Sequence, residues 1–500
     1  MPSDVQDAKR YGLFIDNESR PPSSGAYIDV ADPYTGETWT QVPDASAADV
    51  DAAIASARKA FTSGPWADTI VPERARLLRR FGDLLGDHAE ELAELQVREN
   101  GKLMREMVGQ MKLLPDHFHY YAGLAQTHGG RTNPVHLPGM MNYTVRQPLG
   151  VVAAVTPWNS PILLLAWKLG PALATGNTLV AKPSEITPVS TLRLAELAVE
   201  AGLPPGVFNV ITGLADPAGR ALSEHPGVDK IAVTGSTATG RAIATAAGSS
   251  LTRLSLELGG KSPNVVFDDA DLDVALNGMV AGIFGASGQS CMAGSRILVQ
   301  DSIYDEVVTK LAERAKKIKL GDPRADDTEM GTVASPAQFE KVLRYFDIAQ
   351  DDGARLAAGG QRATGPGLDQ GLFVQPTVFA DVTNDMRIAR EEVFGPVASV
   401  LKFADEDEAL QIANDTEFGL AAGVWTLNLP RAHRMASKLR AGTVWINNYR
   451  KTSYLTPFGG FDQSGVGREN GPDALYEYTE EKSVWVDVGQ GVKDPFNPRA

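Results

Sequence analysis

Short, continuously apolar runs alternate with helical segments through the middle of this 500-residue sequence. The runs between residues 150 and 258 are GVVAAVT (150–156), NTLVAK (177–182), VFNVI (207–211), DKIAVTG (229–235) and RLSLEL (253–258), and helical segments between them include 161–175 and 188–201. Strands that are apolar throughout and joined by helices indicate a parallel sheet covered on both faces. Ligands of such sheets bind at the carboxyl ends of the strands, which is where the polar segments TPWNSP, KPSE and GSTATG lie.

A second alternation runs from residue 263 to about residue 447. Its predicted strands are PNVVF, RILVQ, FVQPTVF, VASVLKF, AAGVWTL and TVWIN. The last predicted strand, KSVWVDV (482–488), alternates in polarity, and too few residues follow it to build a sheet of its own. We therefore expect it to pair with another segment, in this chain or in another subunit, because proteins protect exposed strand edges.

The N-terminal region is predicted to begin as an extended, turn-rich arm over residues 1–45. A helix is predicted to begin at Ser46, because Ser46 and Asp49 form a capping-box pattern before apolar residues at helical spacing. A second, long helical pattern runs through seven apolar positions: Leu77, Leu78, Phe81, Leu84, Leu85, Leu92 and Leu95. The opening residues MPSDVQD lack the apolar core of a signal peptide, so none is expected.

Charge and cysteine content restrict the partners that we expect. The net charge is −15, and an acidic surface repels phosphate backbones, so neither nucleic acid nor an anionic membrane surface is an expected partner. The longest apolar stretches, such as 162–167, fall far short of the roughly 20 residues that span a bilayer. Cys291 is the only cysteine, which excludes an internal disulfide and a cysteine-rich zinc site. We predict no metal site and a reducing, cytoplasmic location.

Four segments carry side chains suited to catalysis. FGASGQSC ends at Cys291, LELGGK places Glu257 at the end of an apolar strand, TPWN places Asn159 at the end of another, and EEVFGP spans residues 391–396. At these segments the sequence resembles the aldehyde dehydrogenase family, and the resemblance extends from about residue 12 to residue 488. A lone cysteine is usually a small buried core residue, but the GQSCMAGSR context favours a catalytic thiol.

The resemblance implies covalent catalysis. Cys291 would attack the aldehyde carbon, since a thiolate is a strong nucleophile and leaves readily from a thioester. The side-chain amide of Asn159 and the backbone N–H of Cys291 would stabilise the resulting oxyanion. Glu257 would activate water to hydrolyse the thioester, with its pKa raised by desolvation. Lys168 would relay the proton of this base or, equally, would be a structural lysine on a helix.

The cofactor site is predicted around the GSTATG segment, which follows a strand and opens a helix whose free N–H groups can bind a pyrophosphate. Alone this segment is a weak signal, because a plain strand-to-helix turn looks the same. The resemblance implies that NAD binds here, and a carboxylate at Glu185 would repel the 2′-phosphate of NADP. The predicted cofactor-binding residues are Thr156, Trp158, Lys182, Glu185, Gly235, Ser236, Gly240, Glu392 and Phe394.

The substrate is a small-molecule aldehyde whose identity the sequence leaves open. Ser160 replaces an aromatic residue that is frequent in family members acting on small aliphatic aldehydes, so a bulky or aromatic aldehyde is one expectation. The basic loop 448–454 should border the substrate tunnel, where Arg450 or Lys451 could pair with a carboxylate of a semialdehyde or simply lie in solvent. The predicted pocket residues are Ser160, Trp167, Ser290, Met292, Arg450 and Thr452.

Three other functions place different demands on these residues than aldehyde oxidation to the acid does. A CoA-acylating dehydrogenase would not need Glu257, and a catalytically inactive relative would not need Cys291, Glu257 and Asn159 together. Hydrolysis of activated esters by the same thiol is expected as a side activity.

The predicted fold is α/β, with a Rossmann-like NAD-binding domain (1–126 and 149–258), a catalytic domain (259–470) and a small β oligomerisation element (127–148 and 471–500). The family's architecture implies a homodimer or a homotetramer.

Overall fold

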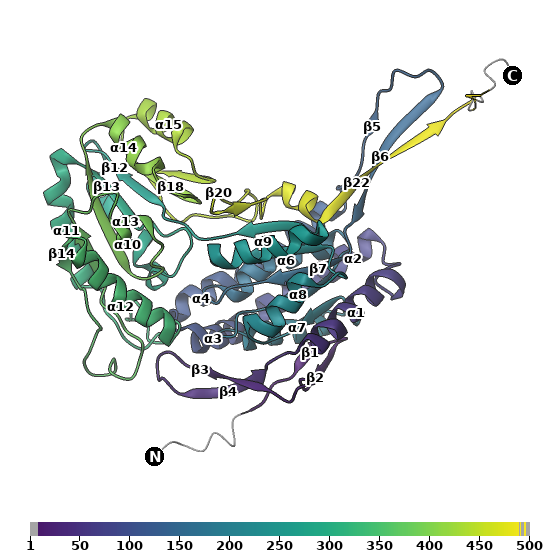
Figure 1. The fold of residues 1–500 in the computed structure, drawn as a ribbon, viewed down its shortest axis with the longest axis horizontal. Coiled ribbons are helices and arrows are strands. Elements are labelled where there is room, and N and C mark those ends of the chain that lie inside the picture. The colour runs from purple at the N-terminus through teal and green to yellow at the C-terminus, as the bar shows by residue number, and fades with distance from the viewer. Residues whose placement is uncertain (1–8, 490, 492–494, 497–500) are drawn as a thin grey trace.

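The computed structural model describes residues 9–489, 491 and 495–496 of the chain (Figure 1). Two α/β bodies lie side by side, and a long antiparallel arm projects from one of them. The fold is therefore α/β, as predicted. The prediction that no signal peptide opens the chain concerns residues 1–8, which lie outside the described residues, as do the ends of two predicted domain ranges.

The first body is built on a mainly parallel sheet. Its strands are β1 (Leu13–Ile15), β2 (Glu18–Arg20), β7 (Val151–Val155), β8 (Thr178–Lys182), β9 (Phe208–Val210), β10 (Lys230–Thr234), β11 (Arg253–Glu257) and β21 (Gly465–Val466). Their order in space is β2-β1-β9-β8-β7-β10-β11-β21, and the central strands β9-β8-β7-β10-β11 are parallel. These five strands match their predicted ranges to within one residue at either end, because the central residues of each are mostly apolar and buried.

Helices cover both faces of this sheet (Figure 1). They are α1 (Ala47–Ser63), α2 (Val71–Asp87), α3 (Ala89–Asn100), α4 (Met104–Met111), α5 (Leu114–Ala125), α6 (Pro161–Ala174), α7 (Val189–Glu200), α8 (Arg220–Glu224) and α9 (Thr237–Ser250). The predicted capping box of α1 is present: Asp49 N–H donates to Ser46, and Ser46 N–H donates to Asp49. The long helical pattern predicted through Leu77 and Leu95 is two helices, because His88 leaves helical geometry at φ −102° and ψ 18°.

The second body contains another sheet. Its strands are β12 (Pro263–Val266), β13 (Arg296–Gln300), β14 (Arg355–Ala358), β15 (Thr377–Ala380), β16 (Val397–Phe403), β18 (Ala421–Trp425) and β19 (Thr443–Ile446), in the order β14-β15-β16-β13-β12-β18-β19. Its helices are α10 (Leu272–Ile283), α11 (Tyr304–Lys316), α12 (Pro336–Asp351), α13 (Arg387–Arg390), α14 (Glu406–Asn414) and α15 (Leu429–Lys438). The predicted strand FVQPTVF was too long, because Pro376 has no N–H to donate and the strand begins after it.

The projecting arm consists of β5 (Thr132–Asn133), β6 (Met140–Pro148) and β22 (Thr479–Asp487). β22 pairs antiparallel with β6 of the same chain along its whole length, from Thr479 opposite Pro148 to Asp487 opposite Met140. Two further antiparallel pairs complete the fold: β3 (Tyr27–Ala31) with β4 (Thr38–Pro43), and β17 (Phe418–Gly419) with β20 (Phe461–Asp462). Across the part of the chain that is described, we find no helix with the length and hydropathy needed to cross a membrane.

Candidate active site

The catalytic candidates gather where the strands of the first sheet end. Thr234, the last residue of β10, lies in register with Glu257, the last residue of β11. The segment TPWN directly follows β7, the neighbour of β10 on the other side. Asn159 of this segment donates from its side-chain amide to the carbonyl of Gln289, 3.0 Å away. This bond ties the end of the first sheet to the loop of the second body that carries Cys291.

Cys291 lies on a tightly turned loop. The turn passes through left-handed backbone at Ala286 (φ 57°), Ser287 (φ 54°) and Gly288 (φ 69°). A Cβ on Gly288 would collide with the carbonyl of Gly395, so the close approach requires glycine at this position. Burial, together with the negative charges of Glu392 and Glu257, raises the pKa of the Cys291 thiol to about 12. The thiol therefore needs a base, or a nearby positive charge, before it can act as a thiolate.

Glu257 is a buried carboxylate whose negative charge acts on Cys291. The residue is 4% exposed, and its Oε2 atom has no hydrogen-bond partner among the described residues. Burial raises its pKa well above the usual 4.5, the charge of Glu469 raises it further, and Lys168 and Arg468 oppose the shift. A carboxyl group of this kind can hold and release a proton near neutral pH.

Lys168 lies beside this carboxylate on α6. Its ammonium donates to the hydroxyl of Thr234 at 2.6 Å and forms an ion pair with Glu469. Both charged side chains are sealed from solvent. Glu469 was missed at the level of sequence, because it lies in a loop without a motif and is joined to Lys168 only by the tertiary fold.

An elongated cavity of about 550 Å³ lies at the strand ends. Its lining includes most of the predicted cofactor residues: Thr156, Trp158, Lys182, Glu185, Gly235 and Ser236. Ser236 caps α9 by accepting from the backbone N–H of Thr239 at 3.1 Å, so the N-terminus of this helix faces the cavity. Gly240 does not line it. A Cβ there would lie 2.5 Å from Leu258 Cδ2, so this glycine allows α9 to pack closely on the chain after β11.

A second cavity of about 150 Å³ continues toward the thiol. It shares Trp158, Gly235 and Ser236 with the larger cavity, and it is also lined by Asn159, Cys291, Glu392 and Phe394. Glu392 accepts from the backbone N–H of Gly260 at 2.9 Å, and the ring of Phe394 meets Trp158 edge-on at 5.3 Å. Gln338 and Lys341 also line this cavity and were not predicted. The two cavities together give a long cleft that leads from Glu185 to Cys291.

The opposite side of Cys291 is apolar. Leu164, Trp167, Leu420 and Phe458 form a buried cluster that packs against Cys291 and Met292. Trp167 and Phe458 meet at a centroid distance of 5.3 Å. Leu164, Leu420 and Phe458 were not predicted from the sequence.

The polar residues predicted for the substrate pocket differ in burial. Ser160 and Ser290 are buried, and Ser160 accepts from the ammonium of Lys102 at 3.4 Å. Burial lowers the pKa of Lys102 to about 8. The guanidinium of Arg450 donates to the carbonyl of Ala281 at 3.0 Å, and Thr452 is exposed.

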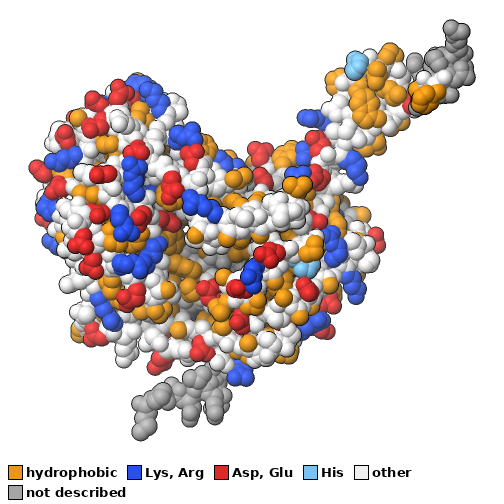
Figure 2. Space-filling view, in the orientation of Figure 1, with side chains coloured by type: hydrophobic (Ala, Val, Ile, Leu, Met, Phe, Trp, Pro, Cys, Tyr) orange, Lys and Arg blue, Asp and Glu red, His pale blue; other side chains and the backbone are white. Residues whose placement is uncertain are grey.

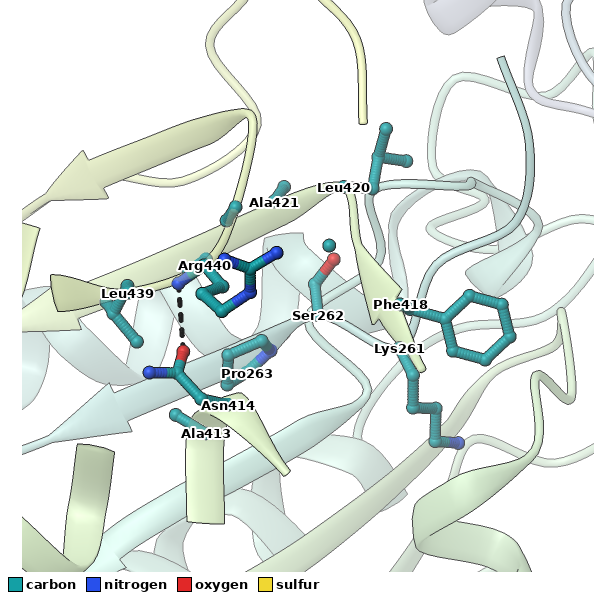
Figure 3. A pocket seen from close by; sticks show the side chains of 13 residues that line it. Lys261, Ser262, Pro263, Ala413, Asn414, Phe418, Leu420, Ala421, Leu439 and Arg440 are labelled. Carbon is teal, nitrogen blue, oxygen red and sulfur yellow. Dashed lines mark hydrogen bonds between the residues drawn. The ribbon is translucent and has the colours of Figure 1, made fainter. Parts of the chain in front are cut away.

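A small cavity lies apart from this cleft in the second body (Figure 3). It has about 10 Å³, is lined by residues such as Ser262, Asn414 and Arg440, and is crossed by a 2.9 Å bond from the Arg440 backbone N–H to Asn414. The ammonium of Lys261 points away from it (Figure 3). This space suffices for about one water molecule, and none of the predicted site residues lines it.

The sequence is similar to known proteins along nearly its whole length. Residues 20–484 match the profile described as the aldehyde dehydrogenase family. The chain is 47% identical over 486 residues to a betaine aldehyde dehydrogenase of Mesorhizobium japonicum, which covers 97% of this chain and 98% of that protein. It is 46% identical over 482 residues to an aldehyde dehydrogenase of Emericella nidulans, with 96% of each chain covered.

The fold is also similar to solved structures over nearly the whole chain. The crystal structure of betaine aldehyde dehydrogenase from Staphylococcus aureus in complex with NAD+ has a TM-score of 0.96 at 41% identity and covers 98% of each chain. The NAD+ complex of an aldehyde dehydrogenase from Bacillus cereus has a TM-score of 0.94 at 44% identity and covers 96% of this chain and 97% of that one. The chain belongs to the aldehyde dehydrogenase family.

Proposed function

We propose that this enzyme oxidises an aldehyde to its carboxylic acid with NAD as hydride acceptor, using Cys291 as nucleophile, Asn159 as oxyanion donor and Glu257 as hydrolytic base. One observation carries the proposal. Cys291 and Asn159 line the same cavity as Glu392 and Phe394, and the charge of Glu257 reaches the thiol strongly enough to raise its pKa.

The first half-reaction forms a bond between Cys291 Sγ and the aldehyde carbon. The thiol must first lose its proton to water in the cleft, because the thiolate is the nucleophile. The carbonyl oxygen then carries negative charge. One N–H of the Asn159 amide is held by Gln289, which fixes the amide and leaves its second N–H to donate to the oxyanion together with the Cys291 backbone.

The long cleft fits a dinucleotide. A helix N-terminus capped by Ser236 suits the pyrophosphate, Lys182 and Glu185 lie where the adenosine ribose would bind, and Glu392 and Phe394 lie beside the thiol. When bound, NAD accepts the hydride that leaves the substrate carbon. The carboxylate of Glu185 supports a preference for NAD over NADP.

The second half-reaction hydrolyses the thioester. Glu257 takes a proton from water as the water oxygen attacks the acyl carbon, and the C–S bond then breaks to release the acid and the Cys291 thiolate. Lys168 and Glu469 adjoin this base and are suited to receive its proton. A CoA-acylating enzyme would need no such buried base, so these contacts support hydrolysis.

The surroundings of the thiol support an uncharged, apolar aldehyde. The cluster of Leu164, Trp167, Leu420 and Phe458 packs on Cys291, and burying a charged group against it would be unfavourable. For Arg450, the bond to Ala281 gives its guanidinium a structural role. A semialdehyde therefore has less support than an aliphatic or aromatic aldehyde.

We further propose that the arm of β5, β6 and β22 is an oligomerisation element in a cytoplasmic homodimer or homotetramer, and that residues 9–126 with 149–258 and residues 259–470 form the NAD-binding and catalytic domains. Hydrophobic side chains gather on the arm (Figure 2), including exposed Leu137, Met141, Trp485 and Val488. Such a patch on a projecting sheet is typical of a subunit contact. Sedimentation of the wild type against Trp485→Asp tests this: an unchanged mass would contradict it.

The catalytic proposal is tested by an aldehyde panel with NAD and NADP, run on the wild type, Cys291→Ser and Glu257→Gln. We expect Cys291→Ser to lose nearly all turnover and Glu257→Gln to release one burst of NADH and then stall. A full steady-state rate in Glu257→Gln would refute the assignment of the base.

A further inference from the structure

The base Glu257 belongs to a buried polar stripe that continues beyond Lys168 and Glu469. Besides Glu257 Oε2, Glu469 Oε2 also has no hydrogen-bond partner among the described residues. A buried polar atom left unpaired costs roughly 1–3 kcal/mol, so native proteins bridge such atoms with ordered water. Two such carboxylate oxygens around one ammonium indicate a hydrated site inside the protein.

The strand register extends this stripe along the sheet. On β10, Lys230, Ala232 and Thr234 point to one face, because successive side chains alternate. On β11, Ser255 is paired with Ala232 and Glu257 with Thr234, so both share that face. The small Ala232 is the only residue between the lysine and the threonine on this face of β10.

Tyr478 and Glu477 cover the far end of this face. Both belong to the 3-10 helix Pro472–Tyr478, and Tyr478 packs in the same buried cluster as Ala232. Neither the Ser255 hydroxyl nor the Tyr478 hydroxyl has a hydrogen-bond partner among the described residues. Burial raises the pKa of Tyr478, and Ser255 opposes this shift. Ser255 Cβ and Glu477 Oε1 each lie 3.2 Å from the position that a Cβ on Gly467 would occupy, so these side chains are neighbours.

The stripe reaches solvent at an ion pair. The ammonium of Lys230 donates to Glu477 Oε2 at 3.3 Å and lies 5.1 Å from the centroid of the Tyr478 ring. The Lys230 side chain is 1% exposed, whereas the Glu477 side chain is 30% exposed. Polar groups thus continue from the sealed base to a carboxylate in contact with water.

We propose that Lys230, Glu477 and Tyr478 form the outer end of a proton outlet, through which the proton taken by Glu257 leaves to solvent by way of Lys168, Glu469 and bridging water. Each hydrolysis leaves one proton on Glu257, and that proton must depart before the next turnover. Proton transfer between these groups requires bridging water, and the buried oxygens without a hydrogen-bond partner in the described structure can bind it: Glu257 Oε2, Glu469 Oε2, Ser255 Oγ and the Tyr478 hydroxyl. The inference rests on the proposed role of Glu257 as base.

Glu477→Gln tests the outlet, since it removes the group that exchanges protons with water but keeps the shape of the side chain. We expect the acyl-enzyme to decay about tenfold more slowly in weak buffer in the turnovers after the first, in a multiple-turnover rapid-quench measurement, while the rate of NADH formation in the first turnover is unchanged. Added imidazole, a diffusible proton acceptor, should restore the decay rate. Glu481→Gln is the matched control, because Glu481 forms a similar ion pair with Arg146 at 3.5 Å and is 33% exposed.

The measurement must separate proton transfer from electrostatics, because the charge of Glu477 also raises the pKa of Glu257. At alkaline pH, where Glu257 is deprotonated in both proteins, a purely electrostatic effect disappears, whereas the loss of an outlet persists. Decay in Glu477→Gln equal to the wild type at alkaline pH in weak buffer, or slowed to the same extent at every imidazole concentration, would overturn the proposal.

Two further variants keep the test decisive. Tyr478→Phe removes only a hydroxyl and should slow the decay of the acyl-enzyme in the same buffer-dependent way. If Glu477→Gln does not fold, the result for Tyr478→Phe decides the inference. Full hydrolysis by Glu257→Gln would refute the proposed base. Stalled hydrolysis in Glu257→Gln with normal decay in both outlet variants would refute the outlet alone.

Discussion

Lys168 and Glu469 lie 301 residues apart in the sequence, yet they form an ion pair whose side chains are 0% and 3% exposed. Desolvating two charges is costly, and removing one partner of such a pair typically costs 3–5 kcal/mol. The two charges act on the pKa of Glu257 in opposite directions: Lys168 lowers it and Glu469 raises it. The pair therefore adjusts the pKa of the base and also joins α6 to the loop that carries Glu469.

Single substitutions of this pair should shift the pH profile of thioester hydrolysis in opposite directions. Lys168→Met removes the charge that favours the carboxylate, so the pKa of Glu257 rises and hydrolysis requires higher pH. Glu469→Gln removes the repelling charge, so the profile moves to lower pH. Both variants should unfold at lower temperature than the wild type. Pre-steady-state deacylation rates across pH test this, and shifts in the same direction would contradict it.

Asn159→Ala should lower kcat/KM for aldehydes about 100- to 1,000-fold, which is the usual cost of losing one oxyanion donor. KM should change little if the amide acts mainly in the transition state. The bond to Gln289 is also lost, so a thermal melt must accompany the kinetics. An unchanged kcat/KM in a folded variant would exclude the oxyanion role.

The pH dependence of the wild type follows from the raised pKa of Glu257. Only the carboxylate accepts a proton from water, so deacylation should increase with pH through a pKa above the ordinary 4.5. The folded state also holds this proton at pH values where the unfolded chain has lost it, so stability falls as pH rises above 4.5 toward the raised pKa. Glu257→Gln should remove that loss, as denaturant unfolding at several pH values would reveal.

Glu185→Gln should improve the use of NADP relative to NAD by about tenfold, since a carboxylate near the ribose repels a 2′-phosphate. Glu224 lines the same cavity, so Glu224→Gln controls for a general loss of negative charge. The ratio of kcat/KM for the two cofactors is the readout. Equal changes in both variants would show that Glu185 has no specific part in the selection.

Sequence patterns predicted the strands well where the apolar runs were continuous and buried, as in β7 and β10. They failed where a single backbone feature decided the boundary, as at His88 between α2 and α3 and at Pro376 before β15. At both positions the apolar periodicity continues across the boundary, so the pattern alone does not reveal where the element ends or begins.

The candidate site was predictable only in part. Residues inside specific motifs, such as Cys291 and Glu257, could be named from the sequence. Glu469, Lys102 and Phe458 could not, because their relevance comes from tertiary contacts with Lys168, Ser160 and Cys291. Lone charged or apolar residues outside a motif carry no signal of such pairing.

Intact-mass measurement of Glu257→Gln after mixing with NAD and an aldehyde tests the covalent mechanism most directly. Cys291 is the only cysteine in the chain, so a thioester can form at one position alone. The account predicts a stable mass increase of one acyl group, located by peptide mapping at Cys291 and absent in Cys291→Ser. Formation of NADH without any acyl adduct on Cys291 would contradict it.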